Sequence, residues 1–176
     1  MYFRPYVYAQ ELENPVFVTI SEATPADLKA TCSWQSSWET EYLQRPGIDK
    51  YALKLGNEII ALGAYTISGN RAYAYIVYLE SAPSSNPVFT DKSSRKYYGI
   101  GGVMLAFGIK YSIDNGCRGD VVFDAKTDRL AEHYAKDFHA LRLPKGNIDG
   151  PERFMLADRE AWDLFSKYLF EEEGNE

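Results

Sequence analysis

One stretch of the sequence, residues 71–125, limits the folds open to this chain more than any other. It holds a strand-like run from Arg71 to Glu80, a long loop, a periodic helical segment and a second strand-like run from Asp120 to Ala125. Two strands that are joined through a helix pair in parallel, because the helix carries the chain back to the end where the first strand began. The stretch therefore predicts a parallel crossover.

The strand-like runs before this crossover indicate antiparallel pairing instead. Tyr51 to Leu55, Glu58 to Ser68 and Arg71 to Glu80 are joined by the short links Gly56-Asn57 and Gly69-Asn70. Two-residue links of glycine and asparagine are typical of tight hairpins. Together with the crossover, they predict an α/β fold with a mixed, largely antiparallel central sheet and helices on both faces.

Weaker signals place the flanking elements. Val16 to Ala23 reads as a strand, and Thr24 opens a helical region that is expected to run to Leu43. Proline and serine are frequent from Ser81 to Tyr98, which predicts a surface loop. The remaining expected elements are a helix over residues 100–114, a helix capped by Thr127 or Asp128, a strand over Arg153–Ala157 and a last helix from Asp158 through Leu169.

Composition favours one domain over residues 1–176, with an extension over 1–15 and an acidic tail over 171–176. The chain is 45% hydrophobic, which is enough for a core. Its 19 Lys and Arg residues against 25 Asp and Glu give a net charge of −6, so the chain lacks the basic field of nucleic-acid-binding proteins. Two cysteines, no metal-ligand spacing, no signal peptide and no membrane-spanning run predict a cytoplasmic protein with neither a metal site nor a membrane partner.

The sharpest local feature is the octapeptide from Arg95 to Gly102, RKYYGIGG, at the start of the periodic helix. Glycines bring backbone N–H groups close to a ligand, and the first N–H groups of a helix have no internal partner. A pyrophosphate suits such a turn, and Arg95 and Lys96 would add charge-assisted contacts. A dinucleotide fingerprint would need glycine in place of Met104, and a P-loop would need Gly-Lys-Ser/Thr after the turn. A purely structural helix start is the alternative interpretation.

These residues resemble the acyl-CoA-binding motif of the GNAT acetyltransferase superfamily. A basic residue, here Lys96, precedes two glycines with the spacing of that motif, at a helix start that follows a strand and a proline-containing loop. Residues Leu130 to Phe138 resemble a later helix of the family, although Asp137 stands where a glycine is common. The segment from Leu79 to Asn86 resembles small single-domain members of unknown substrate.

The resemblance implies an N-acetyltransferase that moves an acetyl group from acetyl-CoA directly to a primary amine of a small molecule or peptide. The strand before the glycine turn would separate from the next strand, and the pantetheine arm of the cosubstrate would pair with its backbone. The residues implied in cofactor binding are Leu79, Ser81, Arg95, Lys96, Tyr97, Tyr98, Gly99, Ile100, Gly101 and Gly102.

Two proton transfers accompany such a reaction. An alkyl amine has a pKa of about 10.4, so its neutralisation at pH 7 costs about 4.6 kcal/mol, and a carboxylate can take that proton. Glu80 is the candidate base because it ends the strand beside the expected thioester, and an ordinary exposed acid is the alternative. The resemblance implies Tyr134 as the acid for the departing thiolate, whereas its spacing with Leu130 and Phe138 also suits a core residue.

The acceptor is expected near the first helical region, where aromatic and acidic side chains could hold a cationic amine. These are Trp34, Trp38, Glu39, Glu41 and Tyr42. A non-catalytic acyl-CoA-binding or regulatory module of the same fold is the competing hypothesis. An enzyme that acetylates aminoacyl-tRNA is a third, which the negative net charge disfavours. The sequence leaves open the identity of the acceptor and the formation of a homodimer.

Overall fold

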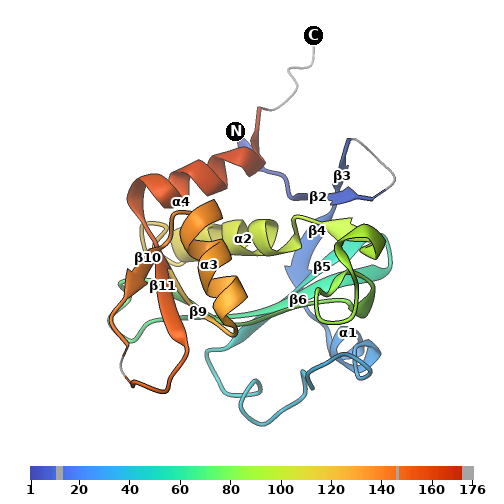
Figure 1. Ribbon diagram of the computed structural model, residues 1–176, viewed down its shortest axis with the longest axis horizontal. Coiled ribbons are helices and arrows are strands. Elements are labelled where there is room, and N and C mark those ends of the chain that lie inside the picture. The colour runs from blue at the N-terminus through green and yellow to red at the C-terminus, as the bar shows by residue number, and fades with distance from the viewer. Residues whose placement is uncertain (11–13, 146, 172–176) are drawn as a thin grey trace. The chain divides into compact units, whose positions relative to one another are not determined.

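A computed structural model describes residues 1–10, 14–145 and 147–171 (Figure 1). The chain forms two compact units. Unit 1 comprises Met1–Ala64, Tyr78–Met104 and Tyr168–Glu176, and unit 2 comprises Tyr65–Val77 and Leu105–Lys167. Three elements contribute residues to both units: β6 (Glu58–Ile67), β7 (Ala74–Ser81) and α2 (Ile100–Asp114). Within the described residues, no helix combines the length and apolar character needed to cross a bilayer.

The main sheet has seven strands in the order β10-β11-β9-β7-β6-β5-β4. The strands not yet located are β4 (Thr19–Glu22), β5 (Asp49–Leu55), β9 (Val121–Ala125), β10 (Leu141–Leu143) and β11 (Glu152–Leu156). β7 and β9 pair in parallel, through Ala74–Ile76 and Val121–Phe123, whereas β4 with β5, β10 with β11 and β11 with β9 pair antiparallel. The predicted mixed, largely antiparallel sheet and its parallel crossover are confirmed.

In unit 2, aromatic packing fixes α3 (Asp128–Asp137) against the strands. Phe123 on β9 and Phe154 on β11 stack with ring centroids 6.2 Å apart. Tyr134 of α3 packs edge-on against both rings, at 4.9 and 5.7 Å. Thr127, one of the two predicted caps, caps the helix. Tyr134 is therefore held by packing on a helix whose start is also fixed.

A charged cluster joins three strands of unit 2. The Asp124 carboxylate on β9 accepts hydrogen bonds from Nε and Nη2 of Arg153, at 2.7 and 3.0 Å, and from the Tyr75 hydroxyl at 2.7 Å. Burial alone would raise the pKa of Asp124, but these donors outweigh burial and lower the pKa below the ordinary 3.8. Burial and the adjacent carboxylate together raise the pKa of Tyr75 to about 12. The cluster therefore stabilises the pairing of β7, β9 and β11.

We expect Asp124→Asn to destabilise the protein at neutral pH and to have a smaller effect in acid. Because the folded state lowers the pKa of Asp124, its ionised form adds stability above about pH 4, and this is lost as pH falls through the folded pKa. Urea unfolding should show a loss of about 1.5–3 kcal/mol at pH 7, the usual range for hydrogen bonds to charged groups. The difference between variant and wild type should shrink at pH 3, and an equal difference at both pH values would contradict this linkage.

Unit 1 contains a second sheet, of three strands in the order β3-β2-β8, that the sequence did not predict. Its strands are β2 (Tyr6–Ala9), β3 (Pro15–Phe17) and β8 (Tyr97–Tyr98), and the chain ends also pair, through β1 (Tyr2–Phe3) and β12 (Leu169–Phe170). The Arg4 guanidinium lies 3.5 Å from the centroid of the Phe17 ring, and Phe17 packs edge-on against Phe170 at 5.5 Å. The N-terminal residues are thus an integral part of unit 1.

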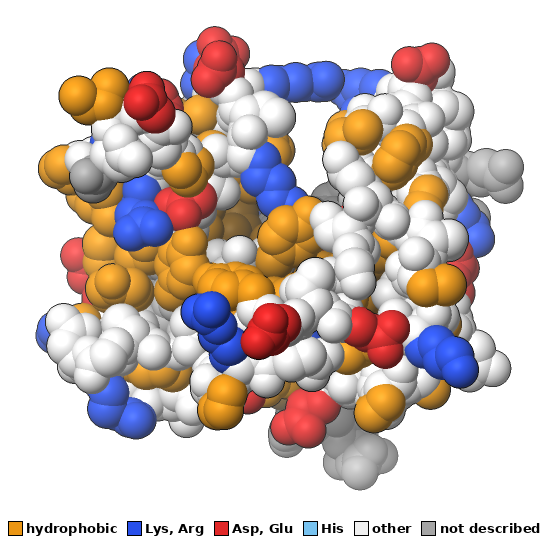
Figure 2. All heavy atoms as spheres, turned by 90° about the horizontal axis from the view of Figure 1, so that it is seen from below, with side chains coloured by type: hydrophobic (Ala, Val, Ile, Leu, Met, Phe, Trp, Pro, Cys, Tyr) orange, Lys and Arg blue, Asp and Glu red, His pale blue; other side chains and the backbone are white. Residues whose placement is uncertain are grey.

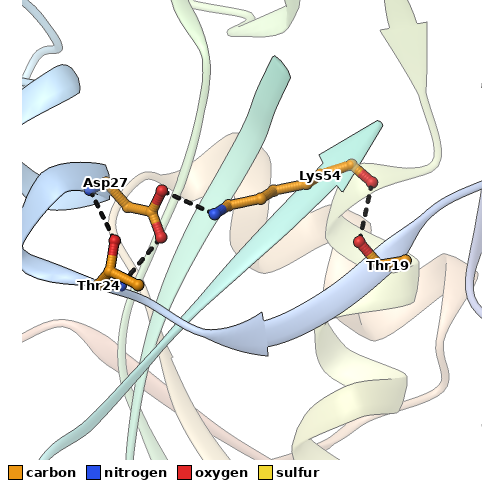
Figure 3. A network of polar contacts seen from close by, with 4 residues as sticks. All are labelled: Thr19, Thr24, Asp27 and Lys54. Carbon is orange, nitrogen blue, oxygen red and sulfur yellow. Dashed lines mark hydrogen bonds and ion pairs between the residues drawn. The ribbon is translucent and has the colours of Figure 1, made fainter. Parts of the chain in front are cut away.

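The short helix α1 (Pro25–Ala30) begins at the predicted cap (Figure 3). The Thr24 N–H donates to Asp27 Oδ2 at 2.9 Å, and the Asp27 N–H donates to Thr24 Oγ1 at 3.2 Å, which completes a capping box. Lys54 Nζ on β5 donates to Asp27 Oδ1 at 2.7 Å, and the Thr19 hydroxyl on β4 donates to the Lys54 carbonyl at 3.5 Å. These bonds connect the start of α1 to both strands.

The helical region expected up to Leu43 is wrong in extent. α1 ends at Ala30, and residues 31–48 contain no further helix. Serine and threonine occupy four of the seven positions from 31 to 37, and such side chains compete with helical backbone bonds. The Thr31 hydroxyl, for example, donates to the Leu28 carbonyl at 2.9 Å.

Other predicted boundaries also move. Val16 to Ala23 is two strands rather than one, because the Val18 N–H donates to the Pro5 carbonyl at 3.0 Å where the chain passes from one sheet to the other. β7 starts at Ala74, after Arg71 with a φ of +54°. The last helix, α4 (Asp158–Phe165), ends before Leu169, which pairs with the N-terminal strand, and β10 was not predicted.

Candidate functional site

The glycine turn lies at the beginning of α2, within unit 1. Its first helical hydrogen bond runs from the Val103 N–H to the Gly99 carbonyl, at 3.1 Å. The N–H groups of Ile100, Gly101 and Gly102 precede that bond, so the helix offers them no carbonyl. The helix dipole adds partial positive charge at the same end. These groups together are suited to binding an anion.

Gly99 and Gly101 lack a side chain for different reasons. Gly99 has a φ of +81°, a conformation that side chains disfavour, and a Cβ there would lie 3.8 Å from the Tyr8 ring. A Cβ at Gly101 would meet no atom within 4 Å, and the residue is exposed. The packing of the described chain therefore leaves open space at Gly101, where a ligand could approach the backbone.

Hydrogen bonds and strand pairing hold the loop before the turn in place. The prediction of a plain surface loop over Ser81–Tyr98 is therefore only partly correct. Ser85 is 4% exposed, and its hydroxyl accepts a hydrogen bond from the Tyr97 N–H at 3.0 Å. The backbone amide of Tyr97 is thus already occupied and is not available to a phosphate. Tyr98 pairs with Tyr8 across β2 and β8, and its hydroxyl donates to the Lys92 carbonyl. Tyr97 and Tyr98 therefore hold the turn in place.

The two basic residues of the octapeptide have different electrostatic surroundings. Lys96 Nζ lies 2.7 Å from Glu58 Oε1, and this hydrogen bond raises the pKa of Lys96. Glu58 also accepts a hydrogen bond from the Tyr97 hydroxyl at 3.0 Å. Arg95, in contrast, has a buried Nε without a hydrogen-bond partner among the described residues. Because an unsatisfied buried N–H is costly, Arg95 is the stronger candidate to bind an anion.

Glu80, near the end of β7, is buried, so its alternative as an ordinary exposed acid is wrong. Its Oε1 accepts a hydrogen bond from the Ser36 N–H at 3.1 Å, and its Oε2 accepts one from Trp38 Nε1 at 2.7 Å. The carboxylate thereby fixes part of the 31–48 segment to β7. Its neighbours along the strand are Leu79 and Ser81, and the parallel pairing of β7 with β9 covers only Ala74–Ile76.

We expect Glu80→Gln to lower the stability of the folded chain. A glutamine has one oxygen, so its NH₂ group would face either the Ser36 N–H or the Trp38 N–H, and one buried donor would lose its acceptor. Such a loss costs about 1–3 kcal/mol. Thermal unfolding should therefore show a lower Tm for this variant than for Glu39→Gln, an exposed position of the same segment. Equal melting temperatures would contradict the structural role of this carboxylate.

Tyr134, in unit 2, combines a packed ring with a hydroxyl that can donate. Its ring contacts Phe123, Phe154 and also Phe138, at 6.4 Å. No hydrogen bond of its hydroxyl occurs in the part of the chain that the structure describes. Burial raises the pKa of Tyr134, so the group stays protonated at neutral pH. The adjacent His133 contacts Asp137 one turn further along the helix.

A cavity of about 370 Å³ lies beside β7 in unit 1. It is lined by Ser36, Ser37, Thr40, Tyr42, Leu43 and Tyr78. Of the five residues expected around the acceptor, only Tyr42 is in the lining, and Trp38 is buried at 1% exposure. Sequence reasoning missed Tyr78, although the period of two along a strand places it on the same side as Glu80.

Charge does not gather on the face of the molecule drawn in Figure 2. There, Lys and Arg side chains alternate with Asp and Glu side chains around hydrophobic ones. Among the described residues, no three His, Cys, Asp or Glu side chains are grouped as they would be to hold a metal ion.

No family model and no curated protein sequence matches this chain, but solved structures share its fold. The ribosomal-protein alanine N-acetyltransferase from Escherichia coli is similar with a TM-score of 0.53 and 13% identity, over 81% of this chain and 97% of the other. AAC(6')-Ib in complex with ribostamycin and coenzyme A is similar with a TM-score of 0.57 and 16% identity, over 83% of this chain and 96% of the other. A chimera of the spermidine N-acetyltransferase SpeG from Vibrio cholerae and hSSAT is similar with a TM-score of 0.55 and 12% identity, over 86% of this chain and 97% of the other. The chain thus has the GNAT acetyltransferase fold that the resemblance implied.

Proposed function

We propose that this protein is an acetyl-CoA-dependent N-acetyltransferase that acts on a primary amine. The observation that carries the proposal is the start of α2. There the amides of Ile100, Gly101 and Gly102 are free of helical partners, and the nearby Arg95 has a buried N–H without an acceptor. The fold is shared with acetyltransferases, one of them an aminoglycoside acetyltransferase in complex with coenzyme A. A pyrophosphate would satisfy all of these donors.

In this proposal, each part of CoA has its own binding residues. The pyrophosphate accepts hydrogen bonds from the amides of Gly99 to Gly102 and from Arg95, with Lys96 adding charge at the rim. Tyr97 and Tyr98 contribute through the contacts that brace the turn. The pantetheine arm binds along the backbone of Leu79 and Ser81, which brings the thioester toward the end of β7.

The transfer needs no covalent enzyme intermediate. The amine nitrogen attacks the thioester carbonyl carbon, the C–N bond forms, and the C–S bond breaks as the tetrahedral intermediate collapses. The nitrogen loses a proton, and the sulfur of CoA gains one. We propose Glu80 as the base, because each carboxylate oxygen can accept a second hydrogen bond besides the one that it already accepts. That second position can hold the ammonium proton or a water molecule that relays it.

Tyr134 is proposed to serve the departing sulfur. A CoA thiol has a pKa of about 8.5, whereas burial raises the pKa of Tyr134 above its ordinary 10.0. Complete transfer of the tyrosine proton to the thiolate is therefore uphill by at least about 2 kcal/mol. A hydrogen bond donated by Tyr134 to the developing thiolate is favourable, and solvent can deliver the proton afterwards.

A direct test combines binding and turnover. Calorimetry should show that CoA binds the protein, and release of free CoA should accompany incubation of acetyl-CoA with a panel of primary amines. CoA binding without acetylation of any amine would overturn the enzyme proposal in favour of a non-catalytic acyl-CoA-binding module. Absence of CoA binding would overturn both.

A further inference from the structure

The cavity beside β7 has features that bear on which class of amine the protein accepts. Its volume, about 370 Å³, is at the small end of the range for small-molecule sites. Tyr78 forms part of its wall, next to Leu79 on the same strand. Successive residues of a strand advance by only about 3.3 Å, so a molecule in this cavity would lie close to a thioester placed along Leu79 and Ser81.

The walls of the cavity are held rigidly. Ser36 is fixed twice, through its N–H to Glu80 and through its hydroxyl, which is hydrogen-bonded to the Tyr78 hydroxyl. Trp38 packs edge-on against the Tyr78 ring, with centroids 5.4 Å apart, while its Nε1 donates to Glu80. The 31–48 segment is therefore shaped by these contacts even though it contains no helix beyond α1. A preformed cavity binds its ligand with little cost in ordering.

The six lining residues include hydroxyl, aromatic and aliphatic side chains but no charged one. Two cations lie close to the lining: Lys50, whose Nζ donates to the Leu43 carbonyl at 2.6 Å, and Arg45, whose guanidinium carbon lies 5.0 Å from the centroid of the Tyr42 ring. The Glu80 carboxylate already accepts two N–H donors. The remaining lone pairs of Glu80 can serve one reacting amine, but none of the six lining side chains is a carboxylate, so a further ammonium group in the cavity would lose part of its hydration without gaining an anionic partner there.

The same surroundings assist the reacting amine. Partial removal from water and the nearby charges of Lys50 and Arg45 both disfavour an ammonium ion, so these two effects lower the pKa of an amine bound there. A larger fraction of that amine is then neutral and nucleophilic, which reduces the work left to a general base. In an acceptor with several ammonium groups, only the reacting nitrogen benefits from the lowered pKa. The dehydration of each further ammonium group in the cavity costs binding free energy.

From these observations we infer that the cavity binds a primary monoamine whose remaining body is uncharged, in preference to a polyamine or an aminoglycoside. This inference rests on the proposed function and names the acceptor class for it. The hydroxyls of Ser36, Ser37 and Thr40 can accept the amine N–H groups, and the rings of Tyr42 and Tyr78 contact the apolar body.

Phenethylamine and spermidine provide the contrasting probes, and their binding to the full chain can be measured by calorimetry without turnover. We expect phenethylamine to bind at least tenfold more tightly than spermidine. Ser37→Asp places a carboxylate in the lining at an exposed position and should reduce that ratio about tenfold or reverse it. Ser33→Asp, at an exposed serine outside the lining, is the matched control and should keep the wild-type ratio.

Spermidine binding as tight as phenethylamine binding would overturn the inference, and so would binding of neither amine or equal effects of the two aspartate substitutions. Acetylation is measured separately, with acetyl-CoA and phenethylamine. The expected binding preference without any acetylation would support the inference about the cavity and overturn the transferase proposal. The two failures are therefore distinguishable.

Discussion

Gly101→Glu is expected to weaken CoA binding at least 100-fold while the protein remains folded. The new carboxylate would stand at the start of α2, in the open space beside Gly101, and would repel a pyrophosphate that the same amides are proposed to bind. A 100-fold loss corresponds to about 2.7 kcal/mol, which one pair of like charges at a partly desolvated site can supply. Calorimetric titration with CoA measures the change.

Gly69→Glu is the matched control for this experiment. Gly69 lies in the exposed link between β6 and β7, and a Cβ there also meets no atom within 4 Å. The control introduces the same charge on the same residue type, so its CoA affinity and Tm should equal those of the wild type. Unchanged CoA affinity in Gly101→Glu would mean that the turn is only a structural helix start.

Tyr134→Phe is expected to lower kcat by about 10² or more with less than a twofold change in CoA affinity. The ring packing against Phe123 and Phe154 survives the substitution, so only the hydroxyl is lost. Loss of one hydrogen bond that is donated to charge developing in the transition state costs about 10²–10³ in kcat. Because the hydroxyl is proposed to act on the thiolate that forms during transfer, its removal should affect kcat and kcat/KM equally. Steady-state kinetics and CoA titration of the same preparation measure both quantities.

Tyr168→Phe is the control for this substitution, because Tyr168 is a buried tyrosine packed against the Tyr6 ring at 4.8 Å. Its turnover should remain that of the wild type. Parallel losses of turnover and CoA affinity in Tyr134→Phe would identify Tyr134 as a packing residue. Full activity of Tyr134→Phe with the preferred amine would remove it from the mechanism.

Local signals explain why much of the fold was predictable. The Gly56-Asn57 link connects β5 and β6 as a tight turn, with Gly56 at a φ of +57°. The caps Thr24 and Thr127 begin α1 and α3, and the turn at Gly99 begins α2. Each of these features depends on the conformational preferences of a few consecutive residues. Such preferences act in the same way before the rest of the chain is folded.

The environment of each candidate side chain was less predictable, because it depends on partners far away in the sequence. Glu80 was expected as a base at a strand end, but its burial results from Ser36 and Trp38, more than forty residues earlier. Lys96 was expected as a phosphate ligand, and its partner Glu58 lies 38 residues before it. The roles of Glu80, Tyr134 and the glycine turn in catalysis and CoA binding stay predictions.

By itself, the sequence determined the order of α1 to α4 and of the main-sheet strands other than β10, together with the parallel crossover and the place of the glycine turn, because these follow from periodicity, caps and glycine conformations within short windows. Only the tertiary structure decided that residues 31–48 form the wall of a cavity and that the N-terminal strand β2 pairs beside the turn. Both outcomes depend on burial and hydrogen bonds between segments that are far apart in the sequence. The free energy of such contacts cannot be read from a short stretch of residues.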